Sequence, residues 1–302
     1  MITPRIGFEI YELTENGKRF TIFEIPSAKG EPVLFKDKAF IRINSQKTGL
    51  QKFPDYLRKI YNSLDDWSAK TIPEASISDL DEEALNTART KFKDKCINES
   101  YYSEIDKWDT ATFLDKAKIT KNGKITNAAI LLLGKNESSY YILPYIAEIT
   151  WKLNTEEKAY EHYGPPFLLN TTKVLQRIRN YHYKFFPNNE LLAVTVNKYD
   201  NRVILEALHN SIAHQDYLKQ ARIIVTEKAD KVIFQNSGNF FYGKPEEYFL
   251  GDKTPEKYRN PWLVRAMVNL GMIDTVGLGI HTMLLGQKER FFPLPDYSNS
   301  TF

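Results

Sequence analysis

The chain has 302 residues, of which 42% are hydrophobic and 26% are charged, an ordinary balance for a globular protein large enough for two domains. Its net charge of +3 does not indicate nucleic-acid binding by itself, and Cys96, the only cysteine, excludes disulfide frameworks and cysteine zinc sites. No apolar run approaches the roughly 20 residues that cross a bilayer. The N-terminus lacks the layout of a signal peptide, so we expect a cytoplasmic protein.

The first 64 residues predict a small β unit that ends in one helix. Aromatic and β-branched segments flank Asn16-Gly17, the strongest short signal for a hairpin, because both residues tolerate positive φ. A second strand pair turns at Asp37-Lys38, and apolar residues at helical spacing follow it. The expected elements are strands at 8–13, 19–25, 32–36 and 39–44 and a helix at 53–64.

Three short phrases of this unit follow one another in a characteristic order. They are Asn16-Gly17-Lys18 before a strand ending in Glu24-Ile25-Pro26, then Glu31-Pro32-Val33, and then Ala39-Phe40-Ile41-Arg42-Ile43-Asn44-Ser45. This order resembles the second half of the Schlafen AlbA-type DNA-binding domain of bacterial regulators. The resemblance implies that Arg42 and Lys47 contact nucleic acid; the alternative is that both are exposed cations at strand ends. The first half of that domain does not appear, so we expect a fragment or a trimmed version of a longer protein.

Residues 65–119 are polar and predict a helical connector without catalytic features. Beyond it, Thr126 is suited to cap an apolar helix, and residues 145–153 alternate as a strand. Apolar residues at helical spacing from Phe167 to Phe186 predict one long helix, which Pro187 ends. The aromatic residues, 13% of the chain, are expected mostly in the core, since they do not interleave with basic residues as in a platform for single strands.

The stretch from Asp200 to Tyr217 predicts the helix around which the chain is organised. Asp200 is suited to be the N-cap, and apolar residues recur after it at steps of three and four. Glu206 and Asn210 lie four residues apart, on one side of the helix. A carboxylate and a carboxamide in this arrangement can hold a hydrated divalent cation, and the carboxylate can orient a water. The alternative is a solvated helix face.

Three further motifs follow this helix. Residues 221–227 and 231–235 predict a hairpin that leads to Asn236-Ser237-Gly238. Next come Arg259-Asn260-Pro261 and Asp274-Thr275-Val276-Gly277-Leu278-Gly279-Ile280. Glycines that open a helix let backbone N–H groups approach phosphate oxygens, and the helix dipole favours the negative charge.

In this order, over residues from about 120 to 295, the four motifs resemble the GHKL (Bergerat-type) ATPase-like domain of RecG-related bacterial transcriptional regulators. The resemblance implies that Glu206 is the catalytic base and that Asn210 holds Mg²⁺ through the nucleotide. It also implies nucleotide contacts from Asn236, Gly238, Gly277 and Gly279.

The chain departs from the family pattern at several of these positions. Asn236 stands where active enzymes have an aspartate, and Gln215 and Thr275 stand where the family has arginines. ATP hydrolysis therefore stays open. Helicase activity is not supported, because the sequence has no P-loop motif.

A second interpretation of the end of this helix is that His209, His214 and Asp216 bind a metal ion. The five-residue step between the histidines places their rings on different faces of the helix, unlike the four-residue step of zinc helices. We therefore favour a hydrogen-bonded structural role for the end of this helix.

We expect an α+β protein with a small β unit at 1–64, a helical connector at 65–119 and a GHKL-like α/β sandwich with a mixed or antiparallel sheet at 120–302. Two functions remain. One is a nucleotide-binding module, with ATP and Mg²⁺ as cofactors, that biases a DNA-binding transcriptional regulator. The other is a non-catalytic scaffold with a degenerate pocket, used for dimerisation or partner docking. DNA is the expected partner of a full-length parent and is expected to bind this chain weakly; a homodimer is a further candidate, and no membrane is expected.

Overall fold

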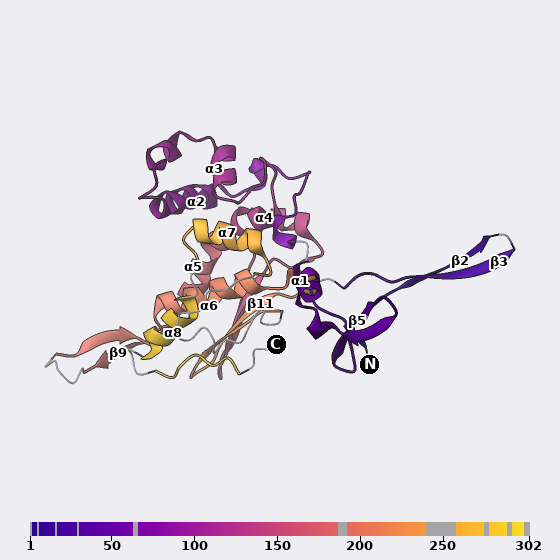
Figure 1. Cartoon of the computed structure of the whole chain (residues 1–302). Coiled ribbons are helices and arrows are strands. Elements are labelled where there is room, and N and C mark those ends of the chain that lie inside the picture. The colour runs from indigo at the N-terminus through magenta and orange to yellow at the C-terminus, as the bar shows by residue number, and fades with distance from the viewer. Residues whose placement is uncertain are drawn as a thin grey trace. The chain divides into compact units, whose positions relative to one another are not determined.

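The structure is a computed structural model that describes residues 2–4, 6–15, 17–28, 30–62, 66–186, 192–238, 258–274, 278–288 and 292–298 (Figure 1). The chain divides into two compact units, residues 1–65 and residues 66–302. Over the described ranges, no helix has both the length and the apolar character needed to cross a membrane.

Unit 1 (residues 1–65) contains a four-stranded sheet in the order β1-β4-β5-β6. Its strands are β1 (Ile2–Thr3), β4 (Leu34–Phe35), β5 (Lys38–Ile43) and β6 (Gln46–Gly49), followed by a 3-10 turn at Leu50–Lys52 and helix α1 (Pro54–Asn62). Lys36 and Asp37 both have positive φ, as a tight turn between antiparallel strands requires. The predicted strand pair is therefore confirmed, with its turn one residue earlier than expected. Ala39 and Leu50 are buried.

The predicted hairpin at Asn16-Gly17 is a separate two-stranded ribbon. It consists of β2 (Glu9–Glu15) and β3 (Lys18–Glu24), which pair antiparallel along their whole length. Many of its large apolar side chains are exposed, among them Leu13 and Phe23.

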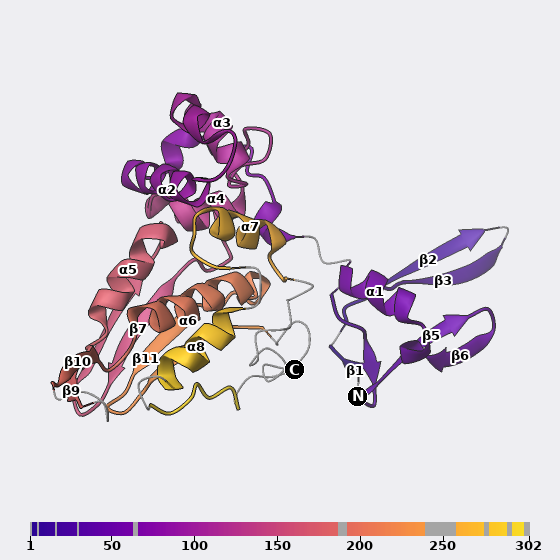
Figure 2. The same cartoon turned by 60° about the vertical axis from the view of Figure 1, so that its left-hand side comes forward.

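Unit 2 (residues 66–302) is built on a mixed four-stranded sheet in the order β12-β11-β7-β8. The strands are β7 (Ile149–Asn154), β8 (Lys158–Tyr163), β11 (Ile223–Glu227) and β12 (Val232–Gln235). β11 pairs parallel with β7, whereas the two outer pairs are antiparallel. Helices α5 (Phe167–Arg177), α6 (Asn201–His214) and α8 (Leu278–Lys288) lie side by side over one face of this sheet (Figure 2). The expected α+β class is confirmed.

The core of unit 2 continues from this sheet into a helical layer. Its helices are α2 (Glu82–Lys95), α3 (Thr110–Lys116), α4 (Asn127–Leu133) and α7 (Pro261–Asn269), with 3-10 turns at Trp67–Ala69, Ile77–Asp79, Tyr102–Lys107, Glu137–Ile142 and Tyr217–Lys219. All residues of α4 are buried, and the Thr126 hydroxyl caps it by accepting a hydrogen bond from Ala129 N (3.1 Å). Phe92 and Phe113 share one core cluster with Leu208 of α6. The division at 65–119 stays a prediction, although these residues add to that core.

The expected long helix at 167–186 is wrong in its second half. Helix α5 ends at Arg177, and the chain continues into a second ribbon, β9 (His182–Phe185) with β10 (Val194–Asn197). The Asn180 side chain binds the backbone of Tyr199 twice, accepting from its N–H (2.9 Å) and donating to its carbonyl (2.8 Å). This tie fixes the start of the ribbon, after which aromatic and polar residues alternate with a period of two, as in a strand.

Candidate nucleotide site

The central helix forms as the sequence predicts. α6 begins at Asn201, and the carboxylate of Asp200 accepts a hydrogen bond from Arg202 N (2.8 Å). Val203, Ile204, Leu208 and Ile212 are buried, as the apolar stripe requires. Glu206 and Asn210 lie beside this stripe, and Glu206 faces Gly279 at the start of α8.

Glu206 and Asn210 contact each other directly. Asn210 Nδ2 donates a hydrogen bond to Glu206 Oε1 (3.1 Å). Burial raises the pKa of Glu206, and the charge of Asp274 raises it further, while the bond from Asn210 opposes both effects. Glu206 is thus a carboxylate with raised basicity, which suits a group that accepts a proton or orients a water.

Gly279, in the first turn of α8, lies against this carboxylate. A Cβ atom at Gly279 would lie 1.9 Å from Glu206 Oε1 and 2.9 Å from its Cδ. A side chain at position 279 would therefore displace the Glu206 carboxylate from its place beside the helix start. The arrangement brings a carboxylate, a carboxamide and the N-terminal turn of a helix into one place, which is a combination suited to a cation–phosphate pair.

The loop after β12 is held against the end of α6. Gly238 has a φ of +117°, which L side chains rarely adopt, and a Cβ there would meet Asp216 Cβ at 3.2 Å and Arg259 Nε at 3.3 Å. Ser237 N donates to Gln215 Oε1 (2.7 Å), and Ser237 O accepts from Asp216 N (2.7 Å). The buried Gln215, which stands where the family has an arginine, therefore braces this loop.

Arg259 is a cation of the site to which sequence reasoning gave no role. Its Nη1 pairs with Asp216 Oδ2 at 3.2 Å, and it lies next to Gly238. The neighbouring Asn260 is buried and donates to the carbonyls of Ala213 (3.0 Å) and Gln215 (2.9 Å). The Arg-Asn-Pro motif was visible in the sequence, but only the fold shows that it closes the end of α6.

Tyr297 is a second residue that the sequence did not point to. Burial raises the pKa of Tyr297, and the charge of Glu206 adds to the rise. The phenol of Tyr297 is thus close enough to Glu206 for their charges to interact. The segment around Tyr297 carries no recognisable motif.

His209 of α6 is held in the core by hydrogen bonds to neighbouring residues. His209 is buried, with Nδ1 2.8 Å from the carbonyl of Met272 and Nε2 3.4 Å from the Thr171 hydroxyl. Burial lowers the pKa of His209 to about 4, so the ring is neutral at pH 7. Tyr217 donates to the carbonyl of Ile212 (3.1 Å). These contacts favour the hydrogen-bonded role over the metal cluster.

The predicted site residues fall into three groups. Glu206, Asn210 and Gly279 meet at the α6–α8 contact. Asn236 and Gly238 follow β12, and the exposed Asn236 makes only a bond to Ser237 O (3.4 Å) among the contacts described. Gly277 lies outside the described residues. Arg42 and Lys47 lie in unit 1, opposite each other on β5 and β6.

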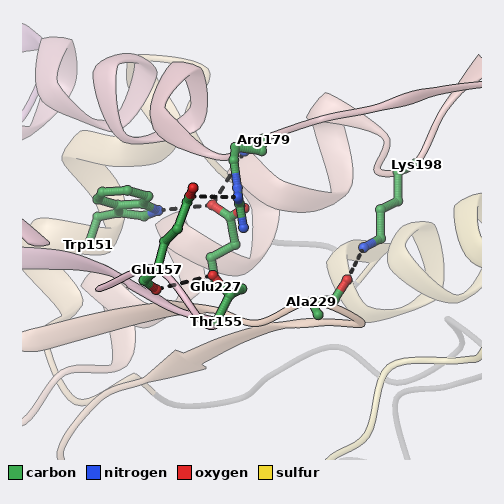
Figure 3. Close-up of polar contacts among 7 residues, drawn as sticks. All are labelled: Trp151, Thr155, Glu157, Arg179, Lys198, Glu227 and Ala229. Carbon is green, nitrogen blue, oxygen red and sulfur yellow. Dashed lines mark hydrogen bonds and ion pairs between the residues drawn. The ribbon is translucent and has the colours of Figure 1, made fainter. Parts of the chain in front are cut away.

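A second polar cluster lies at the other end of the sheet, around the buried Glu227 (Figure 3). Its carboxylate accepts from Arg179 Nε (2.7 Å), Arg179 N (3.3 Å) and Trp151 Nε1 (3.3 Å). These bonds join β11, β7 and the start of the β9–β10 ribbon, beside a cleft of about 450 Å³. Burial raises the pKa of Tyr199, which lines the cleft, to about 12. The cluster pins the ribbon to the sheet.

Comparison with known proteins points to the same C-terminal region. A family model described as "Putative ATP-dependent DNA helicase recG C-terminal" matches residues 220–301, which include the Asn-Ser-Gly, Arg-Asn-Pro and glycine motifs. This match supports a RecG-related ATPase-like C-terminal domain. A second model, "Domain of unknown function (DUF8451)", matches residues 55–149. The search of curated proteins finds no match.

Among solved structures, the chain is similar to the DIP2311 protein from Corynebacterium diphtheriae, with a TM-score of 0.56 at 17% identity. The similarity covers 95% of this chain and 56% of that protein. At this identity the likeness concerns the fold. This chain spans little more than half of the length of that protein.

Proposed function

We propose that unit 2 is a Mg²⁺-dependent nucleotide-binding module of a DNA-binding transcriptional regulator. The observation that carries this proposal is the contact of Glu206 with both Asn210 and Gly279. The family match over residues 220–301 gives it independent support. ATP is the nucleotide that the resemblance implies.

The residues present fit such a ligand. Asn210 uses its Nδ2 for Glu206, which leaves Oδ1 as an oxygen ligand, and oxygen ligands are those that Mg²⁺ prefers. Mg²⁺ bound with a nucleotide neutralises phosphate charge. Asn236 and Gly238 are assigned to the base, where a carboxamide can accept a hydrogen bond from the adenine amino group. Gly279 is assigned to the phosphates, through the N-terminal turn of α8.

The nucleotide links the parts of the pocket. Glu206 and Asn210 belong to α6, Gly279 to α8, and Gly238 to the loop after β12. A ligand that contacts all three would favour one relative arrangement of these elements. Its difference in affinity between the two arrangements sets how far the equilibrium between them shifts. This is the step by which we expect nucleotide to bias a regulator.

Calorimetric titration of ATP and of ADP, each with and without Mg²⁺, tests the proposal. We expect Mg²⁺-dependent binding in the micromolar range, about −7 to −8 kcal/mol. Absence of heat, together with an unchanged melting temperature at millimolar nucleotide, would refute nucleotide binding and leave the scaffold function.

The second candidate function, a dimerising scaffold, is favoured by the β2–β3 ribbon. Its register places Tyr11, Leu13, Phe20 and Ile22 on one face, each close to half exposed. An isolated two-stranded ribbon is at best marginally stable in water, so such a face is expected to be covered. Glu9 and Glu24 pair at one end of the ribbon, and Glu15 and Lys18 pair at the other. Two ribbons packed face to face in opposite directions would bring Lys18 of each ribbon onto the Glu9–Glu24 pair of the other.

Sedimentation of the full chain tests this candidate. The wild type should be a dimer at micromolar concentration, and Leu13→Glu should be a monomer with an unchanged melting temperature of unit 2. A matched Thr14→Glu variant, on the opposite face of the ribbon, should stay dimeric. A monomeric wild type, or dimers in both variants, would exclude the ribbon as the contact.

A further inference from the structure

Asp66 and Ser68, at the start of unit 2, are bonded to the first turn of a distant helix. Asp66 Oδ2 accepts a hydrogen bond from Trp262 N (2.8 Å), and Ser68 Oγ accepts one from Leu263 N (3.0 Å). Both donors belong to α7, 195 to 196 residues further along the chain. The Ser68 hydroxyl itself donates to Asp66 Oδ1 (2.6 Å), so the two side chains form one connected group.

These bonds take the place of a cap that α7 lacks. The first backbone N–H groups of a helix have no partner within the helix. Pro261 has no N–H, and Asn260, the N-cap residue, uses its side chain for two carbonyls at the end of α6 (3.0 and 2.9 Å) instead of capping α7. Asp66 and Ser68 therefore cap the helix from another part of the chain, and the charge of Asp66 suits the positive end of the helix dipole.

The start of α7 also borders residues 236–238, the base loop, which contains the two residues that the proposed site assigns to the nucleotide base. The backbone of this loop is held by Gln215 and Asp216, each through a bond of 2.7 Å. Arg259, just before α7, pairs with Asp216 Oδ2 (3.2 Å) and lies next to Gly238. A shift of the first turn of α7 would therefore move the residues that hold the base loop.

Trp67 adds a contact to the other element that holds the base loop. Its ring stacks on that of Tyr217, with the centroids 4.6 Å apart and the planes at 16°. Both rings are buried, and Tyr217 directly follows Asp216 in the chain. The carbonyl of Trp67 accepts a hydrogen bond from Asn127 Nδ2 (3.0 Å) of the buried helix α4. Residues 66–68 thus contact both the start of α7 and the end of α6.

We propose that Asp66 and Ser68 are positioning residues for the base loop, and that they couple nucleotide in the proposed site to the segment that enters unit 2. The coupling rests on the nucleotide site proposed above, whereas the positioning is a property of the chain without ligand. Asp66 directly follows unit 1 in the chain. A ligand that fixes the base loop therefore also fixes the residue to which unit 1 is covalently joined.

Amide hydrogen exchange of the full chain without nucleotide tests the positioning. Ser68→Ala removes the partner of Leu263 N and should speed exchange of the Ser237 amide by roughly 2- to 12-fold, the factor that one hydrogen bond contributes. Asp66→Ala should have the same effect. Asp66→Asn retains an oxygen that can accept from Trp262 N, so this variant should restore slow exchange.

Asp81→Ala is the matched control, because Asp81 caps α2 through the same kind of bond, from Ala84 N (2.9 Å). This variant should speed exchange at Ala84 and leave the Ser237 amide unchanged. In Ser68→Ala the Ala84 amide should exchange at its wild-type rate, which verifies that the variant is folded. Faster exchange at Leu263 without any change at Ser237 would make Ser68 a local cap only and overturn the positioning.

Mg²⁺–ATP tests the coupling. Saturating ligand should slow exchange of the Leu263 amide by at least about 5-fold, the lower end of usual couplings between sites, and leave Ala84 unchanged. Because coupling is reciprocal, Asp66→Ala should weaken ATP binding in calorimetry by up to the same factor. ATP binding with an unchanged Leu263 amide would overturn the coupling and leave the nucleotide site in place. Absence of ATP binding would refute the nucleotide site and the coupling together, whereas the Ser237 amide decides the positioning in either case.

Discussion

The carboxylate of Glu206 occupies the space that a side chain at position 279 would need, with Oε1 1.9 Å from the position of a Cβ atom on Gly279. Asn210 holds the carboxylate there by one hydrogen bond. The first turn of α8 can therefore pack closely against α6, because Gly279 has no side chain. A side chain at this position would move the Glu206 carboxylate away from α8.

This contact predicts the effect of Gly279→Ala. The added methyl group should displace the Glu206 carboxylate and weaken Mg²⁺-dependent ATP binding by about tenfold or more, since a displacement of the order of 1 Å at a site is costly. Gly7→Ala is the matched control, because a Cβ at Gly7 would meet nothing within 4 Å. Calorimetry measures both. Equal ATP affinity of the two variants would place nucleotide elsewhere.

Glu206→Gln should make the fold more stable at neutral pH. Burial raises the pKa of Glu206 from 4.5, so the folded state binds this proton more tightly than the unfolded state does. Ionisation of Glu206 therefore destabilises the folded wild type. This loss of stability is absent below pH 4.5 and develops as the pH rises through the raised pKa. The variant should therefore melt higher than the wild type at pH 7.5, with the difference vanishing near pH 4.5. A lower melting temperature of the variant at pH 7.5 would contradict this assignment.

His209 should make stability fall in mild acid. Its pKa is lowered from 6.5 to about 4 in the fold, so the unfolded state takes up the proton first. The free energy of unfolding should be constant above pH 6.5 and fall by about 2 kcal/mol between pH 6.5 and pH 5 from this residue. Chemical denaturation at several pH values measures the slope. His209→Gln should reduce the slope and leave the part that comes from His214, whose pKa burial also lowers to about 4. His182→Gln, at an exposed position, should leave the slope unchanged.

Arg179 and Arg177 form ion pairs of the same length but different burial. Arg179 Nε lies 2.7 Å from Glu227, whose side chain is 4% exposed, and Arg177 Nε lies 2.7 Å from Glu161, which is 40% exposed. Arg179→Ala should destabilise the protein by about 2–4 kcal/mol, because it leaves a buried carboxylate unpaired and Arg179 itself is partly screened. Arg177→Ala should cost less than about 1 kcal/mol. Equal losses on denaturation would show that burial of Glu227 is not decisive.

Local signals predicted the central parts of the fold. The cap at Asp200, the stripe through Leu208 and the pair Glu206–Asn210 depend on spacing within one helix, and all three are found. The hairpin at 223–235 and the cap at Thr126 follow from equally short patterns. Each of these features is determined by neighbours a few residues away.

Features that depend on distant contacts were not predicted. In the sequence, Gln215 stands where the family has an arginine and so indicates the loss of a cation. In the structure its buried side chain accepts a hydrogen bond from Ser237 N. Arg259 places a cation beside Gly238 in the same loop. The helix predicted over 167–186 ends early because Asn180 is tied to Tyr199. Phe35 and Lys38, and likewise Arg42 and Lys47, are separated along the sequence, and only the strand register shows that they lie opposite each other.

The most direct test of the nucleotide site is the Mg²⁺ dependence of ATP affinity in the wild type and in Asn210→Ala, measured by calorimetry beside the melting temperature of each protein. We predict that Mg²⁺ strengthens binding to the wild type by at least tenfold and has almost no effect on the variant, with the two melting temperatures within a few degrees of each other. The same Mg²⁺ effect in both proteins would contradict the assignment of Asn210, and with it the proposed site between α6 and α8.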